Sequence, residues 1–79
     1  MNEEEIFNKL KEMISEQFGI DINTIRKESS FIDDLAADSL DLVELVMNIE
    51  ETYSIEIADE DTDKIFTVED MVKYIYNNQ

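Results

Sequence analysis

Apolar side chains recur along this chain at helical spacing, and little in the sequence would interrupt a helix. Among its 79 residues there are no Pro and a single Gly, so the two strongest helix breakers are almost missing. Only residues 54–57 alternate between polar and apolar, as a half-buried strand would, and no partner strand is evident. We therefore interpret residues 54–57 as an extended connector and predict an all-α protein.

The spacing predicts three longer helices and one short helix. The first lies near the N-terminus and ends before Gly19, where a left-handed cap is expected. The second spans residues 38–53, a short helix is expected at 59–63, and a last helix of about ten residues begins after Thr67. Residues 21–35 lack a period and are predicted to form a long loop, held by isolated apolar residues, with room for a short helical turn.

Each longer helix has one apolar face, as expected of helices that pack around a shared core. The first presents Ile6, Phe7, Leu10, Met13, Ile14 and Phe18, the second Leu42, Val43, Leu45, Val46, Met47, Ile49 and Tyr53, and the last Val68, Met71, Val72 and Ile75. Glu50 falls within the second face, so that face is not expected to be wholly buried. A chain of this length holds one modest core, so residues 1–79 are predicted to form a single domain, a four-helix bundle.

The charge of the chain restricts its partners. The formal net charge is -15, from 21 carboxylates against six Lys and Arg. Thirteen of those carboxylates lie within residues 28–63, which contain no Lys or Arg. Nucleic acid and anionic membranes carry the same sign and are not expected to bind, whereas basic protein surfaces and cations are. Acidity that serves only solubility is the alternative interpretation.

Missing residue types exclude several functions. The chain has no Cys, hence no disulfide and no thiolate, and no His, the commonest general base and metal ligand. No apolar run approaches the roughly 20 residues that span a bilayer, and residues 1–5 are acidic, unlike a secretory signal. We expect a soluble, cytoplasmic, monomeric protein that is not an enzyme.

Ser39 stands at the predicted start of the second helix, between Asp38 and Asp41. Serine is a common N-cap, but Asp38 can cap instead, and Leu42 occupies the position where a capping box would place Glu or Gln. A nucleophilic serine needs an adjacent base and oxyanion donors, and the sequence around Ser39 offers no base. The third interpretation is modification by another enzyme. A helix N-terminus favours a phosphate, and the neighbouring aspartates would suit a transferase that brings a divalent cation and a basic surface.

The stretch around Ser39 is distinctive as a whole. It reads Asp33, Asp34, Leu35, Ala36, Ala37, Asp38, Ser39, Leu40, Asp41, Leu42, Val43, Glu44, Leu45 and Val46, and further matching residues are Glu50, Glu51, Ile55, Glu56, Ile57, Asp59, Glu60, Asp61, Thr67, Val68, Glu69 and Asp70. This pattern resembles the signature of acyl carrier proteins, most closely those of dissociated, type II fatty acid synthesis. With the length and phase of the first helix included, the resemblance covers nearly the whole chain.

The resemblance implies a cofactor and a set of partners. In that family the serine matching Ser39 receives phosphopantetheine from coenzyme A, through a Mg²⁺-dependent phosphopantetheinyl transferase. The thiol of this arm then carries growing acyl chains as thioesters in fatty acid biosynthesis. The family fold is a four-helix bundle with a short third helix, and fatty acid synthesis enzymes with basic docking patches recognise the second helix. Carried over by position, the partner-binding residues are Asp38, Leu40, Asp41, Val43, Glu44, Met47, Glu50 and Glu51.

Two positions depart from the family pattern. Ala36 stands where Gly is usual and is expected to limit a backbone conformation with positive φ, which Gly adopts more easily. Ala58 stands where Pro is common. Neither departure affects the attachment chemistry, but both bear on the shape of the loops that contain them.

Two rival interpretations remain at the level of sequence. Asp59, Asp61, Asp63 and Asp70 match an EF-hand count, but Lys64 replaces the turn glycine and the last ligand is not Glu. No specific metal site is therefore predicted, although loose binding of divalent cations to the carboxylates would relieve repulsion. The other functional class is a passive acidic interaction module with Ser39 unmodified or phosphorylated. Within the carrier class, a peptidyl or polyketide carrier is the alternative.

Overall fold

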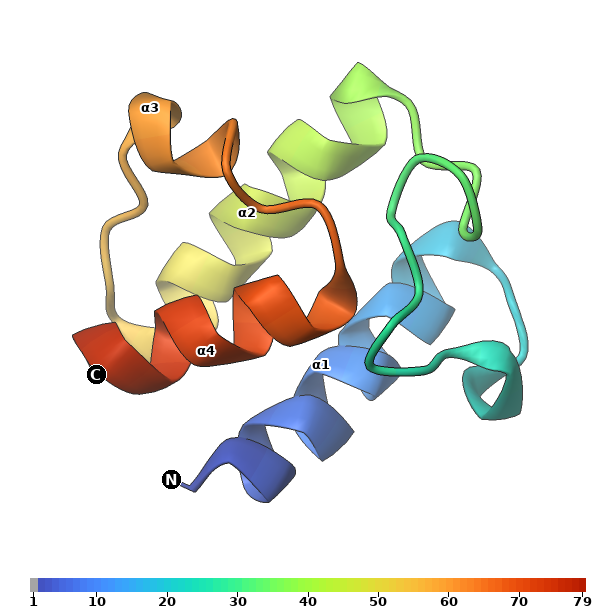
Figure 1. Cartoon of the computed structure of the whole chain (residues 1–79), viewed down its shortest axis with the longest axis horizontal. Helices are drawn as coiled ribbons and strands as arrows, with labels where there is room; N and C mark the ends of the chain where they lie inside the picture. Colours follow the sequence, from blue (N-terminus) through green and yellow to red (C-terminus); the bar gives the residue numbers. More distant parts are fainter. Residues whose placement is uncertain (1) are drawn as a thin grey trace.

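The computed structural model describes residues 2–79, and this part of the chain forms four α-helices and one short 3-10 helix (Figure 1). In chain order these are α1 (Glu3–Phe18), η1 (Ile22–Thr24), α2 (Ser39–Tyr53), α3 (Asp59–Thr62) and α4 (Val68–Asn78). The prediction of an all-α bundle with three longer helices and one short helix is confirmed. The short helical turn in the long loop is present as η1.

α1 is stabilised at both of its ends by local sequence. Asn2 and Glu5 form a capping box, in which the Asn2 side chain accepts from the Glu5 amide at 2.8 Å and Glu5 accepts from the Asn2 amide at 3.2 Å. Gly19 has φ 68° and ends the helix in the left-handed conformation that its position predicted. Between these caps, Ile6, Leu10 and Ile14 are fully buried, so the predicted period marks the face that packs.

α4 supplies the other continuous side of the core. Val68, Met71, Val72 and Ile75 are all buried, as their spacing predicted. α1 packs against both α4 and α2, and α4 passes in front of the C-terminal part of α2 in Figure 1. α1 and α4 therefore provide most of the helical part of the core.

The long loop between η1 and α2 is held by its own apolar residues and by backbone hydrogen bonds to the start of α4. Its buried apolar residues are Ile25, Phe31, Leu35 and Ala37. The Phe31 amide donates to the Phe66 carbonyl at 3.0 Å, and the Val68 amide donates to the Ser29 carbonyl at 3.0 Å. An isolated antiparallel bridge joins Ser30 to Thr67. The sequence predicts no strand pairing, and this bridge between residues far apart in sequence is the exception within residues 2–79.

No helix within residues 2–79 is both long enough and apolar enough to cross a membrane.

Candidate functional site

Ser39 is the first residue of α2, and the cap of that helix is made by its neighbour. The Asp38 carboxylate accepts from the Asp41 amide at 2.9 Å, and the Asp41 carboxylate accepts from the Asp38 amide at 3.2 Å. This reciprocal pair satisfies backbone N–H groups that would otherwise donate to the hydroxyl of a serine N-cap. Ser39 is exposed, and its hydroxyl has no hydrogen-bond partner among the described residues. The prediction that Asp38 caps the helix in place of Ser39 is confirmed.

The loop that leads into Ser39 turns sharply at Ala36. Ala36 has φ 54°, a left-handed conformation, so our expectation that alanine would limit a positive φ here was wrong. The physical reason lies in the residues around it. Phe31, Leu35 and Ala37 are buried, and the Ala37 amide donates to the Phe31 carbonyl at 2.8 Å. These contacts fix the turn and offset the strain that the Ala36 side chain introduces.

Ala58 keeps the shape that proline would have. Its φ of -67° lies at the value that a proline ring imposes, and it precedes the first residue of α3. Both departures from the family pattern therefore leave the backbone in the conformation of the residue that is usual there.

The outward face of α2 combines large apolar side chains with carboxylates. Leu40 is 65 % exposed, Met47 60 % and Val43 55 %. Glu44 and Glu51 are exposed on the same helix, and Asp38 is exposed at its start. A helix that turns three large apolar side chains to solvent has a surface suited to another protein.

Three of the predicted partner-binding carboxylates have hydrogen bonds inside the molecule, and one of them is that of Asp38, the N-cap described above. Asp41 is half-buried and completes the capping box described above. Glu50 is half-buried, and its carboxylate accepts from the Ile57 amide at 2.9 Å. One feature of the sequence indicates that Glu50 has a contact inside the molecule, because Glu50 falls within the apolar face of α2.

A groove of about 420 Å³ begins at Ser39 and runs between α2 and the segment that contains α3. The α2 side is lined by Ser39, Leu42, Val43, Val46, Met47 and Glu50. The opposite side is lined by Ile57, Asp59, Thr62 and Asp63. Since one residue of helix advances about 1.5 Å, the α2 side is roughly 16 Å long from Ser39 to Glu50. The groove was not predicted, because its two sides come from segments whose contact is tertiary.

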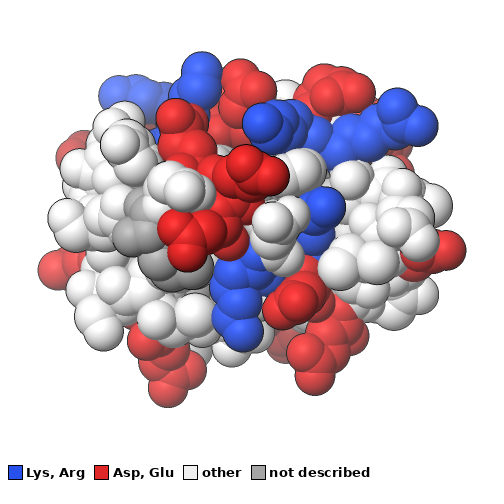
Figure 2. All heavy atoms as spheres, turned by 90° about the horizontal axis from the view of Figure 1, so that it is seen from below, with Lys and Arg blue, Asp and Glu red and all other residues white. Residues whose placement is uncertain are grey.

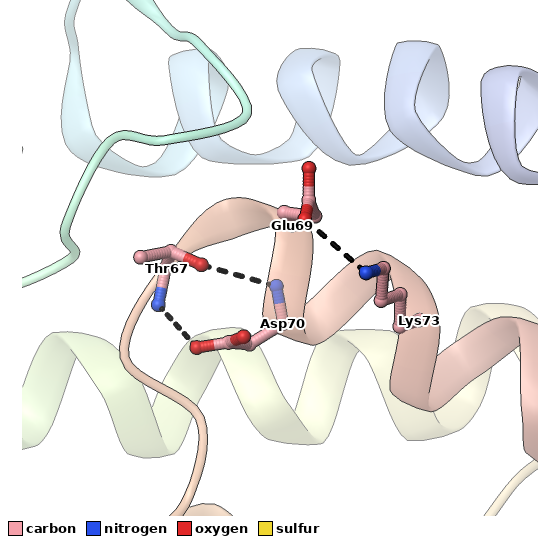
Figure 3. Close-up of polar contacts among 4 residues, drawn as sticks. All are labelled: Thr67, Glu69, Asp70 and Lys73. Atoms are coloured by element: carbon pink, nitrogen blue, oxygen red, sulfur yellow. Dashed lines mark hydrogen bonds and ion pairs between the residues drawn. The ribbon is translucent and has the colours of Figure 1, made fainter.

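The acidic residues from 59 to 70 do not form a metal site in the structure. Within residues 2–79, no group of three or more carboxylates is placed to hold a metal ion. Asp70, the last residue of the EF-hand count, is used elsewhere. Its carboxylate accepts from the amides of Phe66 and Thr67, both at 3.1 Å. The Thr67 hydroxyl accepts from the Asp70 amide, and Figure 3 shows both contacts between Thr67 and Asp70.

The pKa values of Asp70, Tyr74 and Tyr53 are shifted from their ordinary values. Burial acts to raise the pKa of Asp70, but the hydrogen bonds from Phe66 and Thr67 and the charge of Lys73 hold it below its ordinary value. Lys73 itself pairs with Glu69 at 3.3 Å (Figure 3). Burial and the hydrogen bond to Asp61 raise the pKa of Tyr74, and burial together with the charge of Glu12 raises that of Tyr53. None of these three side chains lines the groove that begins at Ser39.

Comparison with known proteins identifies the family. The profile described as "Phosphopantetheine attachment site" matches residues 8–75. An acyl carrier protein from Lactobacillus johnsonii is 53% identical over 79 residues, which is 100% of this chain and 99% of the relative. The chain belongs to the acyl carrier proteins. A second acyl carrier protein, from Clostridium acetobutylicum, is 54% identical over 70 residues, which is 89% of this chain and 91% of the relative. The solved acyl carrier protein from Enterococcus faecalis has a TM-score of 0.84 and 38% identity, and the match covers 100% of both chains.

Membership of this family establishes what the molecule does. It carries growing acyl chains on phosphopantetheine between the enzymes of fatty acid biosynthesis, and it is a carrier and not an enzyme. The bound cofactor supplies a thiol, on which the acyl group is held as a thioester. The chain has no Cys of its own, so the thiol must come with the cofactor. An exposed serine hydroxyl that no other group engages fits this requirement.

Proposed function

We propose that Ser39 is the residue to which phosphopantetheine is attached. The single observation that supports this most strongly is that the Ser39 hydroxyl is exposed and unused, because Asp38 and Asp41 cap the helix between them. The hydroxyl is therefore free to replace the 3′,5′-ADP part of coenzyme A at the phosphorus atom, with loss of its proton. The product is a phosphodiester at a helix N-terminus, where the helix dipole favours its charge.

The chemistry of this transfer belongs to the partner. Residues 28–63 contain no Lys or Arg that would bind the phosphates of coenzyme A, and the carboxylates around Ser39 would repel them. A phosphopantetheinyl transferase that brings Mg²⁺ and a basic surface would supply the missing positive charge. We propose that such a transferase loads the chain, and that residues 1–79 act as one carrier domain, as a monomer and in the cytoplasm.

The exposed face of α2 is proposed as the surface that partner enzymes contact. Leu40, Val43 and Met47 would enter apolar depressions of the partner. Asp38, Glu44 and Glu51 would face its basic residues. Contacts of this mixed kind speed and orient the encounter without making it permanent, which suits a carrier that must leave each enzyme.

Asp41 and Glu50 are proposed to contribute to this surface mainly through their charge. Both carboxylates already accept backbone hydrogen bonds within the chain. They have less freedom to reorganise around a partner than the exposed carboxylates of Glu44 and Glu51.

The attachment site is tested by intact mass. The chain is incubated with coenzyme A, Mg²⁺ and a broad-specificity phosphopantetheinyl transferase. One phosphopantetheine per chain is expected for the wild type and none for Ser39→Ala. Ser54→Gly is the matched control, because Ser54 is also exposed, at the other end of α2, and its φ of 55° suits glycine; it should load fully. Loading of Ser39→Ala, or loss of loading in Ser54→Gly alone, would refute the assignment.

A further inference from the structure

α3 is the most weakly anchored helix of the bundle. It has four residues, none of them buried, and its N-cap, Ala58, offers no side-chain hydrogen bond to the helix. Such a short helix contributes little stability of its own. Yet α3 and the residues next to it form one side of the groove that begins at Ser39. The position of that side must therefore be set by contacts from outside the helix.

Two carboxylate hydrogen bonds contribute such contacts, one just before α3 and one within it. Glu50 of α2 accepts from the Ile57 amide at 2.9 Å, just before α3. Asp61, within α3, accepts from the hydroxyl of Tyr74 at 2.9 Å, and Tyr74 belongs to α4. Ile57 is buried at 6 % exposure, so the first anchor is reinforced by packing. Ile65, which follows α3, packs partly buried against the core, whereas within α3 the hydrogen bond to Asp61 is the contact with α4.

The surroundings of the Tyr74 hydroxyl agree with this role. Burial and the Asp61 carboxylate raise its pKa, and the backbone N–H of Ala58 acts in the opposite direction. The hydroxyl thus lies at the N-terminal end of α3, close to both residues. A proline at position 58 would have no N–H to place there.

We propose that Tyr74 is a positioning residue for the groove. By holding Asp61, its hydroxyl fixes the α3 side of the groove and so limits the length of acyl chain that the groove accommodates. This inference rests on the proposed attachment at Ser39, since only a chain tethered there enters the groove from that end. Tyr74 does not line the groove and acts only through Asp61.

Hydrogen exchange of the unloaded protein tests the first half of the proposal. The amides of Asp61, Thr62, Lys64 and Ile65 make backbone hydrogen bonds within residues 58–65 and serve as probes. In Tyr74→Phe they should exchange roughly fivefold faster, the factor that corresponds to one hydrogen bond of typical net strength. The amides of α1 should be unchanged.

Matched variants separate this effect from general destabilisation. Tyr76→Phe makes the same chemical change on the same helix at an exposed side chain, and it should leave the probe amides unaffected. Asp61→Ala should accelerate them as Tyr74→Phe does, and the double variant should add nothing further. Asp61→Asn keeps an acceptor and should remain close to the wild type. Faster exchange spread evenly over the bundle, or none at the probes, would overturn the proposal.

Loaded protein tests the second half. Hexanoyl and dodecanoyl forms are prepared with the corresponding acyl coenzyme A, and the rise in Tm over the unloaded protein is measured for each. Release of the α3 side should increase the rise for dodecanoyl more than for hexanoyl in Tyr74→Phe, and not in Tyr76→Phe. Equal changes for both chain lengths would overturn the limit on chain length. Failure of Ser39 to load would instead refute the proposed attachment, and the exchange measurement would still decide whether Tyr74 holds α3.

Discussion

α1 and α4 bury the centres of their predicted apolar faces, whereas α2 turns three large apolar side chains outward. Every residue of the predicted face of α4 is buried, as is the centre of the face of α1. α2 has more apolar residues than either, but only Leu45 and Ile49 are fully buried, and α3 buries none. The same residue types thus lie in the core in the half of the molecule that contains α1 and α4, and on the surface in the half that contains α2 and α3. An apolar helix face indicates that another surface covers it, and that surface can belong to a different molecule.

The two halves differ in charge as well. Residues 28–63, which contain α2 and α3, hold thirteen of the 21 carboxylates and none of the six cations. Figure 2, seen from below the view of Figure 1, shows Lys and Arg side chains among carboxylates on the face where α1 lies. Lys11 and Lys27 both approach the Phe7 ring there, at 4.6 and 5.5 Å from its centroid. One half is therefore nearly balanced in charge, and the other presents a single sign to its partners.

The largest expected effect separates the halves by stability. Ile14→Ala removes a fully buried side chain of α1 and should lower the free energy of unfolding by about 3 kcal/mol. Met47→Ala removes a side chain of similar size from the exposed face of α2 and should change it by less than about 0.5 kcal/mol. Urea unfolding measures both. A large loss for Met47→Ala would show that the outward face contributes to the fold.

Recognition by the transferase should depend on the charges of the α2 surface and not on the net charge of the chain. Glu44→Lys and Lys9→Glu change the net charge by the same amount in opposite directions, and both positions are exposed. At low salt, Glu44→Lys should reduce kcat/KM for transferase loading about tenfold, because it places a cation on the contacting face. Lys9→Glu, on α1, should change it less than twofold.

Salt provides the control for this pair. The difference between the two variants should shrink as ionic strength rises, since exposed charges are screened over about 10 Å at 0.1 M. If Lys9→Glu accelerated loading as strongly as Glu44→Lys slowed it, net charge would govern the encounter and the division of the molecule into halves would be irrelevant to it.

Sequence predicted most where one helix face decides the outcome. The buried residues of α1 and α4 follow from spacing alone, and the cap at Asp38 follows from local chemistry, because its partner Asp41 is three residues away. Spacing could not tell that Val43 and Met47 face solvent, since an apolar arc looks the same whichever molecule covers it.

Longer-range features escaped prediction for a different reason. The bond from Tyr74 to Asp61 joins residues thirteen positions apart on separate helices, and neither residue is unusual in its own segment. The positive φ of Ala36 likewise follows from Phe31 and its neighbours being buried, which no local preference encodes.

Left-handed residues in the two halves offer a smaller test. Gly19 ends α1 at φ 68°, with nothing within 4 Å of the place where a Cβ would stand, and Ala36 adopts φ 54° before α2. Gly19→Ala should destabilise by about 1 kcal/mol through conformation alone, and Ala36→Gly should stabilise by about 0.5–1 kcal/mol. Thermal unfolding of both variants checks the signs. A loss of stability in Ala36→Gly would mean that its side chain contributes packing that exceeds the strain.

The smallest expected effect lies where the halves meet. The hydroxyl of Tyr53, at the end of α2, is buried without a hydrogen-bond partner in the described chain, and burial and the charge of Glu12 on α1 raise its pKa. Because the pKa of Tyr53 is higher in the folded than in the unfolded protein, the protonated hydroxyl contributes to the free energy of unfolding. This contribution is fully present below about pH 10 and is lost as the pH rises through the folded pKa. Tyr53→Phe should be neutral or stabilising by less than about 0.5 kcal/mol at pH 7, since it removes an unsatisfied group.

At alkaline pH the same variant should lose less stability than the wild type, and Tyr76→Phe, which removes an exposed hydroxyl, should lose as much as the wild type. Urea unfolding at pH 7 and at a series of values above pH 10 distinguishes them. A destabilisation of Tyr53→Phe by about 1 kcal/mol at pH 7 would show instead that the hydroxyl has a partner, such as an ordered water, at the junction of α1 and α2. The two halves would then be joined there by a polar contact and not by packing alone.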